Sequence, residues 1–263
     1  MTDEIWQQEW DAGLYAENTG HHRAFDEWFL VTTPLRDDLS LVDLGCGAGD
    51  FTRVLADRVP NGEVVGVDPQ PGFIEEARRR AGPNQRFAVG TGQELVAALE
   101  GQRFDGVVSR AALQWAPAAD QLRIVRQIHL SLVPGGFFRL DMSGAGNITA
   151  VVTLLDDISA SLGGPRSPWC FADPGWYLEI LEQAGFDVSD GFVRSVAQRR
   201  PFTGSTLWGW FESQVLNAYE VDLAPNRHGE FRQTLRDRFG ELQRHDGTFD
   251  QTFVRLDVLA TAR

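Results

Sequence analysis

The stretch VDLGCGAGDF, residues 42–51, decides how this chain folds. It begins with a short apolar run that ends at Leu44, continues with three glycines that alternate with small residues, and ends where a helical pattern begins near Asp50. Glycine permits positive φ and a close approach to the backbone, so a bulky ligand can lie directly against such a turn. We interpret the stretch as a strand, a ligand-binding loop and a helix in succession.

The spacing of the glycines separates two classes of ligand. The dinucleotide fingerprint is G-x-G-x-x-G, with the pyrophosphate at the helix N-terminus. Gly45 and Gly47 fit this pattern, but Asp50 stands at the third position, where its carboxylate would repel a pyrophosphate. Asp43, two residues before the first glycine, suits a cationic group such as an ammonium. An NAD-dependent oxidoreductase therefore remains a third alternative. It holds only if the protein binds NAD and does not bind a sulfonium cofactor.

The rest of the chain supplies an α/β sheet. Between residues 39 and 144, short apolar runs alternate with amphipathic segments, which is typical of βαβ units and a buried parallel sheet. After residue 144, helical patterns dominate, and a Gly-Gly-Pro turn at 163–165 interrupts them. The runs that predict strands are 41–44, 64–67, 86–89, 106–109, 137–142, 186–194 and 252–259. We expect a mostly parallel seven-stranded sheet with helices on both faces.

The charge and cysteine content limit the partners and the compartment. Lys and Arg number 24 against 37 Asp and Glu, and a net charge of −13 argues against a nucleic-acid partner. The acidic N-terminus lacks the basic and apolar regions of a signal peptide, and every apolar run is shorter than a membrane span. The two cysteines, Cys46 and Cys170, suit a reducing compartment. We expect a cytoplasmic protein that binds neither nucleic acid nor membrane.

A second acidic residue fits the same ligand site. The apolar run 64–67 ends in Asp68, about 20 positions after the glycine loop, where dinucleotide-type folds hold a ribose diol. The two oxygens of a carboxylate can accept hydrogen bonds from both ribose hydroxyls. The sequence therefore predicts a nucleoside-containing ligand with a cationic group.

Four segments carry a family resemblance: VDLGCGAGDFT at 42–52, VVGVDPQPGFIEEAR at 64–78, FDGVVSRAALQW at 104–115 and LVPGGFFRLDM at 132–142. In this order and spacing they resemble the core motifs of class I S-adenosylmethionine-dependent methyltransferases. The resemblance implies a Rossmann-like fold and S-adenosyl-L-methionine as the cofactor. Within that family the chain most resembles the small-molecule branch of trans-aconitate methyltransferases.

The resemblance also implies which residues contact the cofactor. The glycines would lie against its methionine part, with Asp43 toward the ammonium and Asp68 on the ribose. The set implied for the cofactor is Tyr15, Asp43, Gly45, Cys46, Gly47, Gly49, Asp68, Pro69, Gln70, Phe73, Thr91, Gly92, Gln93, Arg110 and Ala111. Two positions depart from the family: Thr91 replaces the usual acid, and Arg110 replaces a small or amide residue. A surface arginine with a packed stem is the alternative for Arg110.

The acceptor is expected beyond the carboxyl ends of the strands. His22, from an N-terminal segment that covers the cofactor in the family, and Trp115, from the loop after the fourth strand, are the candidate catalytic residues. A solvated histidine pair and a core tryptophan are the alternatives. His129, His228 and His245 are expected to be solvated, and no histidine spacing indicates a metal site.

The aromatic content points to a flat or lipophilic acceptor. The residues expected to line an acceptor pocket are Trp169, Phe171, Trp208 and Phe211. The predicted activity is methyl transfer to an oxygen or carbon of a small aromatic or lipophilic molecule, in secondary metabolism. The alternative is a protein that binds the cofactor without transferring methyl, such as a cyclase or a regulatory binding module.

The predicted organisation is a single methyltransferase domain over residues 1–263, and its oligomeric state is left open. Within it, lid helices occupy 1–37 and the cofactor-binding core occupies 38–145. Cap helices with the sixth strand occupy 146–250, and the last strand occupies 251–263.

Overall fold

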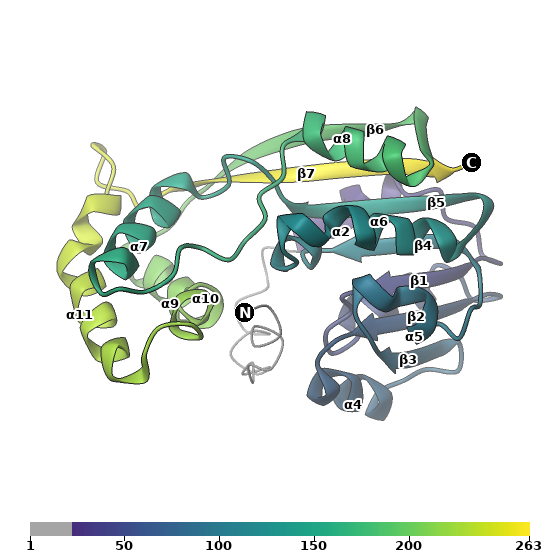
Figure 1. Ribbon diagram of the computed structural model, residues 1–263, viewed down its shortest axis with the longest axis horizontal. Helices are drawn as coiled ribbons and strands as arrows, with labels where there is room; N and C mark the ends of the chain where they lie inside the picture. The colour runs from purple at the N-terminus through teal and green to yellow at the C-terminus, as the bar shows by residue number, and fades with distance from the viewer. Residues whose placement is uncertain (1–22) are drawn as a thin grey trace. The chain divides into compact units, whose positions relative to one another are not determined.

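The computed structural model describes residues 23–263 (Figure 1). These residues form two compact units. The sheet unit consists of Ala24–Ala145, Cys170–Val196 and Arg255–Arg263. The helical unit includes Gly146–Trp169 and Ala197–Val254. Tyr15 and His22, two residues predicted to contact the cofactor and the acceptor, lie outside the described residues.

One seven-stranded sheet organises the fold, with the strand order β3-β2-β1-β4-β5-β7-β6. The first five strands pair in parallel, and β7 pairs antiparallel with β5. The strands are β1 Ser40–Leu44, β2 Glu63–Asp68, β3 Gln85–Val89, β4 Phe104–Arg110, β5 Leu132–Ser143, β6 Phe186–Arg200 and β7 Gln251–Ala262. The predicted Rossmann-like, mostly parallel sheet is confirmed.

Helices cover both faces of this sheet. Val107 and Val108 are neighbours on β4, so their side chains point to opposite faces, and both are fully buried. The helices of the sheet unit are α2 Arg23–Val31, α3 Asp50–Ala56, α4 Pro71–Arg79, α5 Leu95–Ala98, α6 Gln121–Leu130 and α8 Pro174–Ala184. Short 3₁₀ turns connect some of them: η2 Gly92–Glu94, η3 Leu113–Trp115 and η4 Ala118–Asp120.

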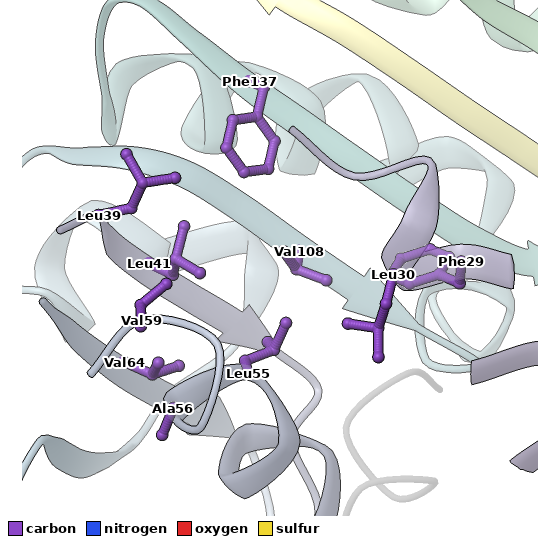
Figure 2. Packing of buried hydrophobic residues seen from close by; sticks show 10 residues of the cluster. All are labelled: Phe29, Leu30, Leu39, Leu41, Leu55, Ala56, Val59, Val64, Val108 and Phe137. Atoms are coloured by element: carbon purple, nitrogen blue, oxygen red, sulfur yellow. The ribbon is translucent and has the colours of Figure 1, made fainter. Parts of the chain in front are cut away.

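The apolar cluster in Figure 2 fixes α2 and α3 to the sheet. Phe29 and Leu30 come from α2, and Leu55 comes from α3. Leu41 on β1 and Val108 on β4 belong to the same cluster. Fully burying a large aliphatic or aromatic side chain contributes about 1.5–3 kcal/mol each, so this cluster accounts for much of the attachment. It also determines where the glycine loop leaves β1 and enters α3.

The helical unit has an aromatic core of its own. The Tyr219 and Phe231 rings stack with centroids 5.8 Å apart, and those of Phe239 and Phe249 stack at 5.1 Å. Its elements are α7 Thr149–Ser161, α9 Gly204–Gln214, α10 Asn217–Glu220, η5 Pro225–Arg227, α11 His228–Arg238 and η6 Phe239–Leu242. Within residues 23–263, the structure contains no helix with the length and apolar character needed to cross a bilayer.

Two expectations need correction. The sixth strand extends past residue 194 to Arg200, because pairing with β7 lengthens a segment whose later residues are mostly polar and lack an apolar alternation. The expectation that His129 is solvated is wrong. Its ring is half-buried, lies edge-on to Phe186 with centroids 5.1 Å apart, and has a buried Nε2. Helix α6, which bears His129, packs against α8. The sequence pattern indicated only a polar position there.

Candidate functional site

The strand order creates a topological switch point between β1 and β4. From β1 the chain continues to β2 on one side, and from β4 it continues to β5 on the other. Ligands of open α/β sheets bind outside the carboxyl ends of the strands at such a point. A Cβ added to Gly45 would lie 2.2 Å from the Cβ of Ala112, so the loops after β1 and β4 meet here. The loops after β1 and β4, which carry several of the predicted cofactor residues, therefore lie side by side at this edge of the sheet.

The three glycines of the loop have different surroundings. Gly45 is pressed against the loop after β4, and a Cβ on Gly49 would lie 2.9 Å from the Phe87 ring. Gly47 has φ +52, and among residues 23–263 no atom lies within 4 Å of the position a Cβ would take. Gly45 and Gly49 thus serve packing, whereas none of the described residues covers Gly47. A ligand that lies against the loop fits this arrangement.

Asp68, the last residue of β2, is tied to the same loop. Its Oδ2 accepts a hydrogen bond from the Gly47 amide, and its Oδ1 accepts one from the Gln70 amide, both at 2.9 Å. Burial raises the pKa of Asp68, and the two amides oppose that rise. Each oxygen of an ionised carboxylate has a second lone pair. Asp68 can therefore orient the loop and still accept hydrogen bonds from a diol.

Asp43 is the most deeply buried acid beside the loop, with 1% of its surface exposed. The Thr52 hydroxyl donates a hydrogen bond to its Oδ2 at 2.7 Å. Burial raises the pKa of Asp43 to about 6, although the Thr52 hydrogen bond and the positive charge of Arg110 both lower it. Asp43 is therefore a deeply buried carboxylate that is ionised at neutral pH, which suits an ammonium ligand.

The residues predicted for the adenine side follow β2 and β3. Pro69 and Gln70 come directly after Asp68, and Phe73 lies in the first turn of α4. The residues that follow β3 and open η2 are Thr91, Gly92 and Gln93. All of these are partly exposed at the carboxyl ends of the strands. Cys46 differs, because it is buried in a cluster with Ile74, Ala77 and Phe87, and burial raises the pKa of its thiol.

The loop after β4 is held in a constrained conformation. Ala111 has a φ of 53, and its amide donates to the Asp141 carbonyl at 2.7 Å. The Gln114 Nε2 donates back to the Ala111 carbonyl, also at 2.7 Å. Trp115 ends this loop at η3 and is partly exposed. A non-glycine residue at positive φ costs about 1–3 kcal/mol, so these two hydrogen bonds maintain a strained turn beside the predicted site.

Arg110, the residue before this turn, is not a surface arginine. Only 9% of its side chain is exposed, and its guanidinium lies over the Phe51 ring, 4.9 Å from the centroid. Its Nε is 3.9 Å from Asp141 Oδ2. The arginine therefore contacts both α3 and β5.

The aromatic residues predicted for the acceptor are distributed over both units. Phe171 belongs to the sheet unit. In the helical unit, Phe211 is fully buried and Trp208 lies edge-on to Phe239 at 5.6 Å, while Trp169 lies edge-on to Tyr219 at 6.0 Å. Trp208 and Phe211 thus take part in the packing of α9, and their role toward an acceptor stays a prediction.

Three residues with evident roles at this edge were not singled out in the sequence. Thr52 is the hydrogen-bond partner of Asp43, and its position nine residues later, inside the first motif, was the available signal. Asp141 lies within the fourth motif but had no assigned partner. Arg255, whose guanidinium binds Asp141, comes from β7, and nothing in the local sequence indicates that contact.

Comparison with known proteins gives the family. A family model described as a methyltransferase domain matches residues 41–136. An uncharacterized methyltransferase of Schizosaccharomyces pombe is 31% identical over 222 residues, which cover 81% of this chain and 82% of the relative. The trans-aconitate 2-methyltransferase of Rhodococcus jostii is 29% identical over 95% of this chain and 98% of its own. Other matches to trans-aconitate 2-methyltransferases span about half of each relative.

A solved structure supports the same fold over most of the chain. Phosphoethanolamine N-methyltransferase 2 of Haemonchus contortus, in complex with phosphomonomethylethanolamine and S-adenosylhomocysteine, superposes with a TM-score of 0.61. The match covers 99% of this chain and 60% of that protein at 16% identity, so it concerns the fold alone. Together with the Schizosaccharomyces pombe relative and with the glycine loop, Asp43 and Asp68 at one sheet edge, the matches show that this chain belongs to the class I S-adenosylmethionine-dependent methyltransferases.

Proposed function

We propose that this methyltransferase transfers a methyl group to an oxygen or carbon of a small aromatic or lipophilic metabolite. The observation that carries the proposal is the space that residues 23–263 leave open at Gly47, between two glycines that pack tightly and one hydrogen bond away from Asp68. This arrangement suits a flat nucleoside ligand with an extended amino-acid part. A small-molecule acceptor is further supported by the trans-aconitate 2-methyltransferases among the relatives.

The proposed cofactor contacts follow from the chemistry of each residue. Asp68 accepts hydrogen bonds from the ribose hydroxyls, and Asp43 faces the ammonium. The proposed adenine side is Pro69, Gln70, Phe73, Thr91, Gly92 and Gln93. Bound S-adenosylmethionine supplies a methyl group on a positively charged sulfur that is already activated toward nucleophiles. The residues of the chain therefore need chiefly to orient the acceptor and exclude water, and correct orientation is worth about 7–11 kcal/mol.

The proposed acceptor residues are His22 and Trp115. A carboxylate acceptor is ionised at neutral pH and needs no base, so these side chains would only position it. A phenol has a pKa near 10 and a carbon acid is weaker still, so either acceptor gains from proton removal by a base such as His22. The indole N–H of Trp115 can donate a hydrogen bond to an acceptor oxygen in both cases. We keep Trp169, Phe171, Trp208 and Phe211 as proposed contacts of a lipophilic acceptor.

The cellular setting is also a proposal. Cys46 and Cys170 are both buried and unbonded to each other, which is compatible with a reducing compartment such as the cytoplasm. We propose that the protein acts there, in secondary metabolism, as a single functional domain.

Two successive measurements test the proposal. First, S-adenosylmethionine and S-adenosylhomocysteine should each raise the thermal midpoint, since a ligand at 100 times its dissociation constant stabilises by about 2.7 kcal/mol. Second, a panel of carboxylic acids, phenols and carbon acids is screened for release of S-adenosylhomocysteine. Binding without turnover on any acceptor class would favour the cyclase or regulatory alternative. Stabilisation by NAD and not by the sulfonium cofactor would contradict the proposal.

A further inference from the structure

β6 is the outermost strand of the sheet. Among the described residues it pairs on one side only, with β7, so every second backbone N–H and C=O along its other side lacks a strand partner. Between residues 188 and 196, only the Ser189 amide has a further hydrogen bond within residues 23–263, donated to Asp187 Oδ1 at 2.8 Å. This edge is therefore open to a strand of another molecule.

The sequence of this edge, VSDGFVRSV at 188–196, has mirror-related residues on both sides of Phe192. Valines stand at the two ends and serines next to them, while Asp190 and Arg194 take mirror positions around Phe192. Two copies that pair antiparallel about Phe192 would therefore place valine opposite valine, serine opposite serine and Asp190 opposite Arg194. In a two-fold symmetric dimer, one patch of the surface must match itself in this way.

The charges of the segment select one register. Asp190 and Arg194 are its only charged residues, so the segment is neutral in a chain with a net charge of −13. A shift of the antiparallel pairing by two residues would place both charges opposite uncharged residues, and parallel pairing in register would bring like charges together. Charged side chains on an edge strand usually prevent pairing between sheets. Opposite charges at mirror positions instead permit it in this single register.

The two charged side chains are already disposed for such a contact. The Arg194 Nε donates to Asp257 Oδ2 at 2.8 Å, and its guanidinium lies 4.0 Å from the Phe192 ring centroid. The Arg194 side chain is nevertheless 45% exposed. Asp190 is exposed and forms no ion pair with any residue from 23 to 263. Asp190 of a second copy would thus meet a guanidinium that is held in place, which reduces the entropy lost on pairing.

We propose that this protein forms a symmetric homodimer in which the 188–196 segments of two copies pair antiparallel about Phe192. The seven-stranded sheets of the two copies then continue into one another, and Asp190 of each copy lies against Arg194 of the other. The paired surface is one strand wide, which is typical of a reversible dimer rather than a permanent one. The proposal concerns assembly, so it stands or falls independently of methyl transfer.

Reversal of the two charges tests the pairing. Sedimentation velocity over a concentration series measures the dimer dissociation constant of wild type, Asp190→Arg, Arg194→Glu and an equimolar mixture of the two variants. Each variant alone should dimerise at least about tenfold more weakly, because two symmetry-related attractive pairs become repulsive. The mixture should return to within about threefold of wild type, since each variant presents opposite charges to the other.

Asp57→Arg is the matched control for the change of net charge. Asp57 is exposed and directly follows α3, which connects β1 to β2, so it lies away from β6 in the order of the sheet. This variant should dimerise like wild type.

Disulfide trapping tests the register independently of charge, with conservative changes at two exposed positions. Ser189 and Ser195 are opposite each other in the proposed pairing, and directly opposed Cα atoms lie about 4.5–5.5 Å apart, a distance that a disulfide spans. A mixture of Ser189→Cys and Ser195→Cys should therefore give a covalent dimer under mild oxidation. Either variant alone should not, because its two copies of the cysteine would lie about 20 Å apart along the strands. The native Cys46 and Cys170 are both buried.

A wild type that remains monomeric throughout the concentration series would overturn the proposal. So would a dimer that neither charge variant weakens, or equal cross-linking of the single serine variants and of their mixture. Circular dichroism checks that each variant is folded. If Arg194→Glu fails to fold, because it loses the contact with Asp257, the serine variants still decide the question.

Discussion

The Thr52 hydroxyl donates a hydrogen bond to Asp43 across the loop that separates β1 from α3, with 2.7 Å between the oxygens. The bond joins a strand residue to the third residue of the following helix, so it closes the glycine loop at its base. This hydrogen bond lowers the pKa of Asp43, and burial outweighs it. The loop is therefore built around a carboxylate that the fold alone does not fully stabilise in its ionised form.

The pH dependence of stability should reveal this carboxylate. The pKa of Asp43 is about 6 in the folded protein and close to 3.8 when unfolded, so the folded state holds the proton more tightly. The free energy of unfolding should therefore decrease by about 3 kcal/mol as the pH rises from about 4 to about 6, and change no further above that range. Urea denaturation between pH 5 and 7.5 measures the upper part of this decrease. Asp43→Asn should lack it, and identical pH profiles for the variant and wild type would show that Asp43 ionises normally.

Asp68→Ala should weaken cofactor binding by about 1.5–3 kcal/mol, because two ribose hydroxyls lose their acceptor. The variant also leaves the Gly47 and Gln70 amides without the oxygens that orient them. Calorimetry with S-adenosylhomocysteine measures the loss. Asp173→Ala is a suitable control, since Asp173 also accepts from two amides, those of Gly175 and Trp176 at the start of α8. An unchanged dissociation constant for Asp68→Ala would remove this residue from the site.

Gly47→Val should abolish cofactor binding in a protein that still folds. The added side chain would meet no atom of residues 23–263 near its Cβ, but it occupies the position proposed for the methionine part. Its φ of +52 adds strain, which a matched variant can isolate. Gly101→Val carries the same kind of strain, with φ +74 and nothing within 4 Å, away from the loop. Both variants should lose similar stability by circular dichroism melts, and only Gly47→Val should lose binding. Normal binding by Gly47→Val would place the ligand elsewhere.

His22→Ala should distinguish the classes of acceptor. With a phenol or carbon acid, kcat should fall about 10²- to 10⁴-fold while cofactor affinity is retained, because a general base is lost. The wild-type rate should then rise with pH through about 6.5, where an ordinary histidine loses its proton. With a carboxylate acceptor, the loss should appear in KM alone. His245→Ala, at an exposed position of the helical unit, is the control. Unchanged kinetics in His22→Ala across this pH range would exclude the assignment.

The cofactor edge of the fold could be predicted from the sequence because its information is local. The glycine loop and Asp68 each follow directly from a run of buried apolar residues, and parallel strands bring such strand ends to one edge. Gly47 comes near Asp68 because β1 and β2, two strands joined by a single crossover, pair in parallel. The departure at Arg110 was visible for the same reason, as a charged residue at the end of a strand.

What could not be predicted depends on pairing between distant segments. Arg255 reaches Asp141 only because β7 lies antiparallel beside β5, and 114 residues separate the two side chains in the sequence. The extension of β6 to Arg200 likewise depends on its neighbour in the sheet, since its last residues carry no apolar alternation. The environment of His129 is set by Phe186, the first residue of β6. Each of these errors arises where tertiary contacts override a local pattern.

The position of β7 has a consequence for synthesis on the ribosome. β7 follows β6 in the chain, yet it lies between β5 and β6, so β6 must remain unpaired with the rest of the sheet until β7 has been made. The five parallel strands can assemble first, with β5 as a temporary edge. During that interval Arg139 is without Asp257, its buried ion-pair partner in the finished protein. Insertion of β7 therefore both joins β6 to the sheet and supplies the carboxylate that compensates a buried guanidinium.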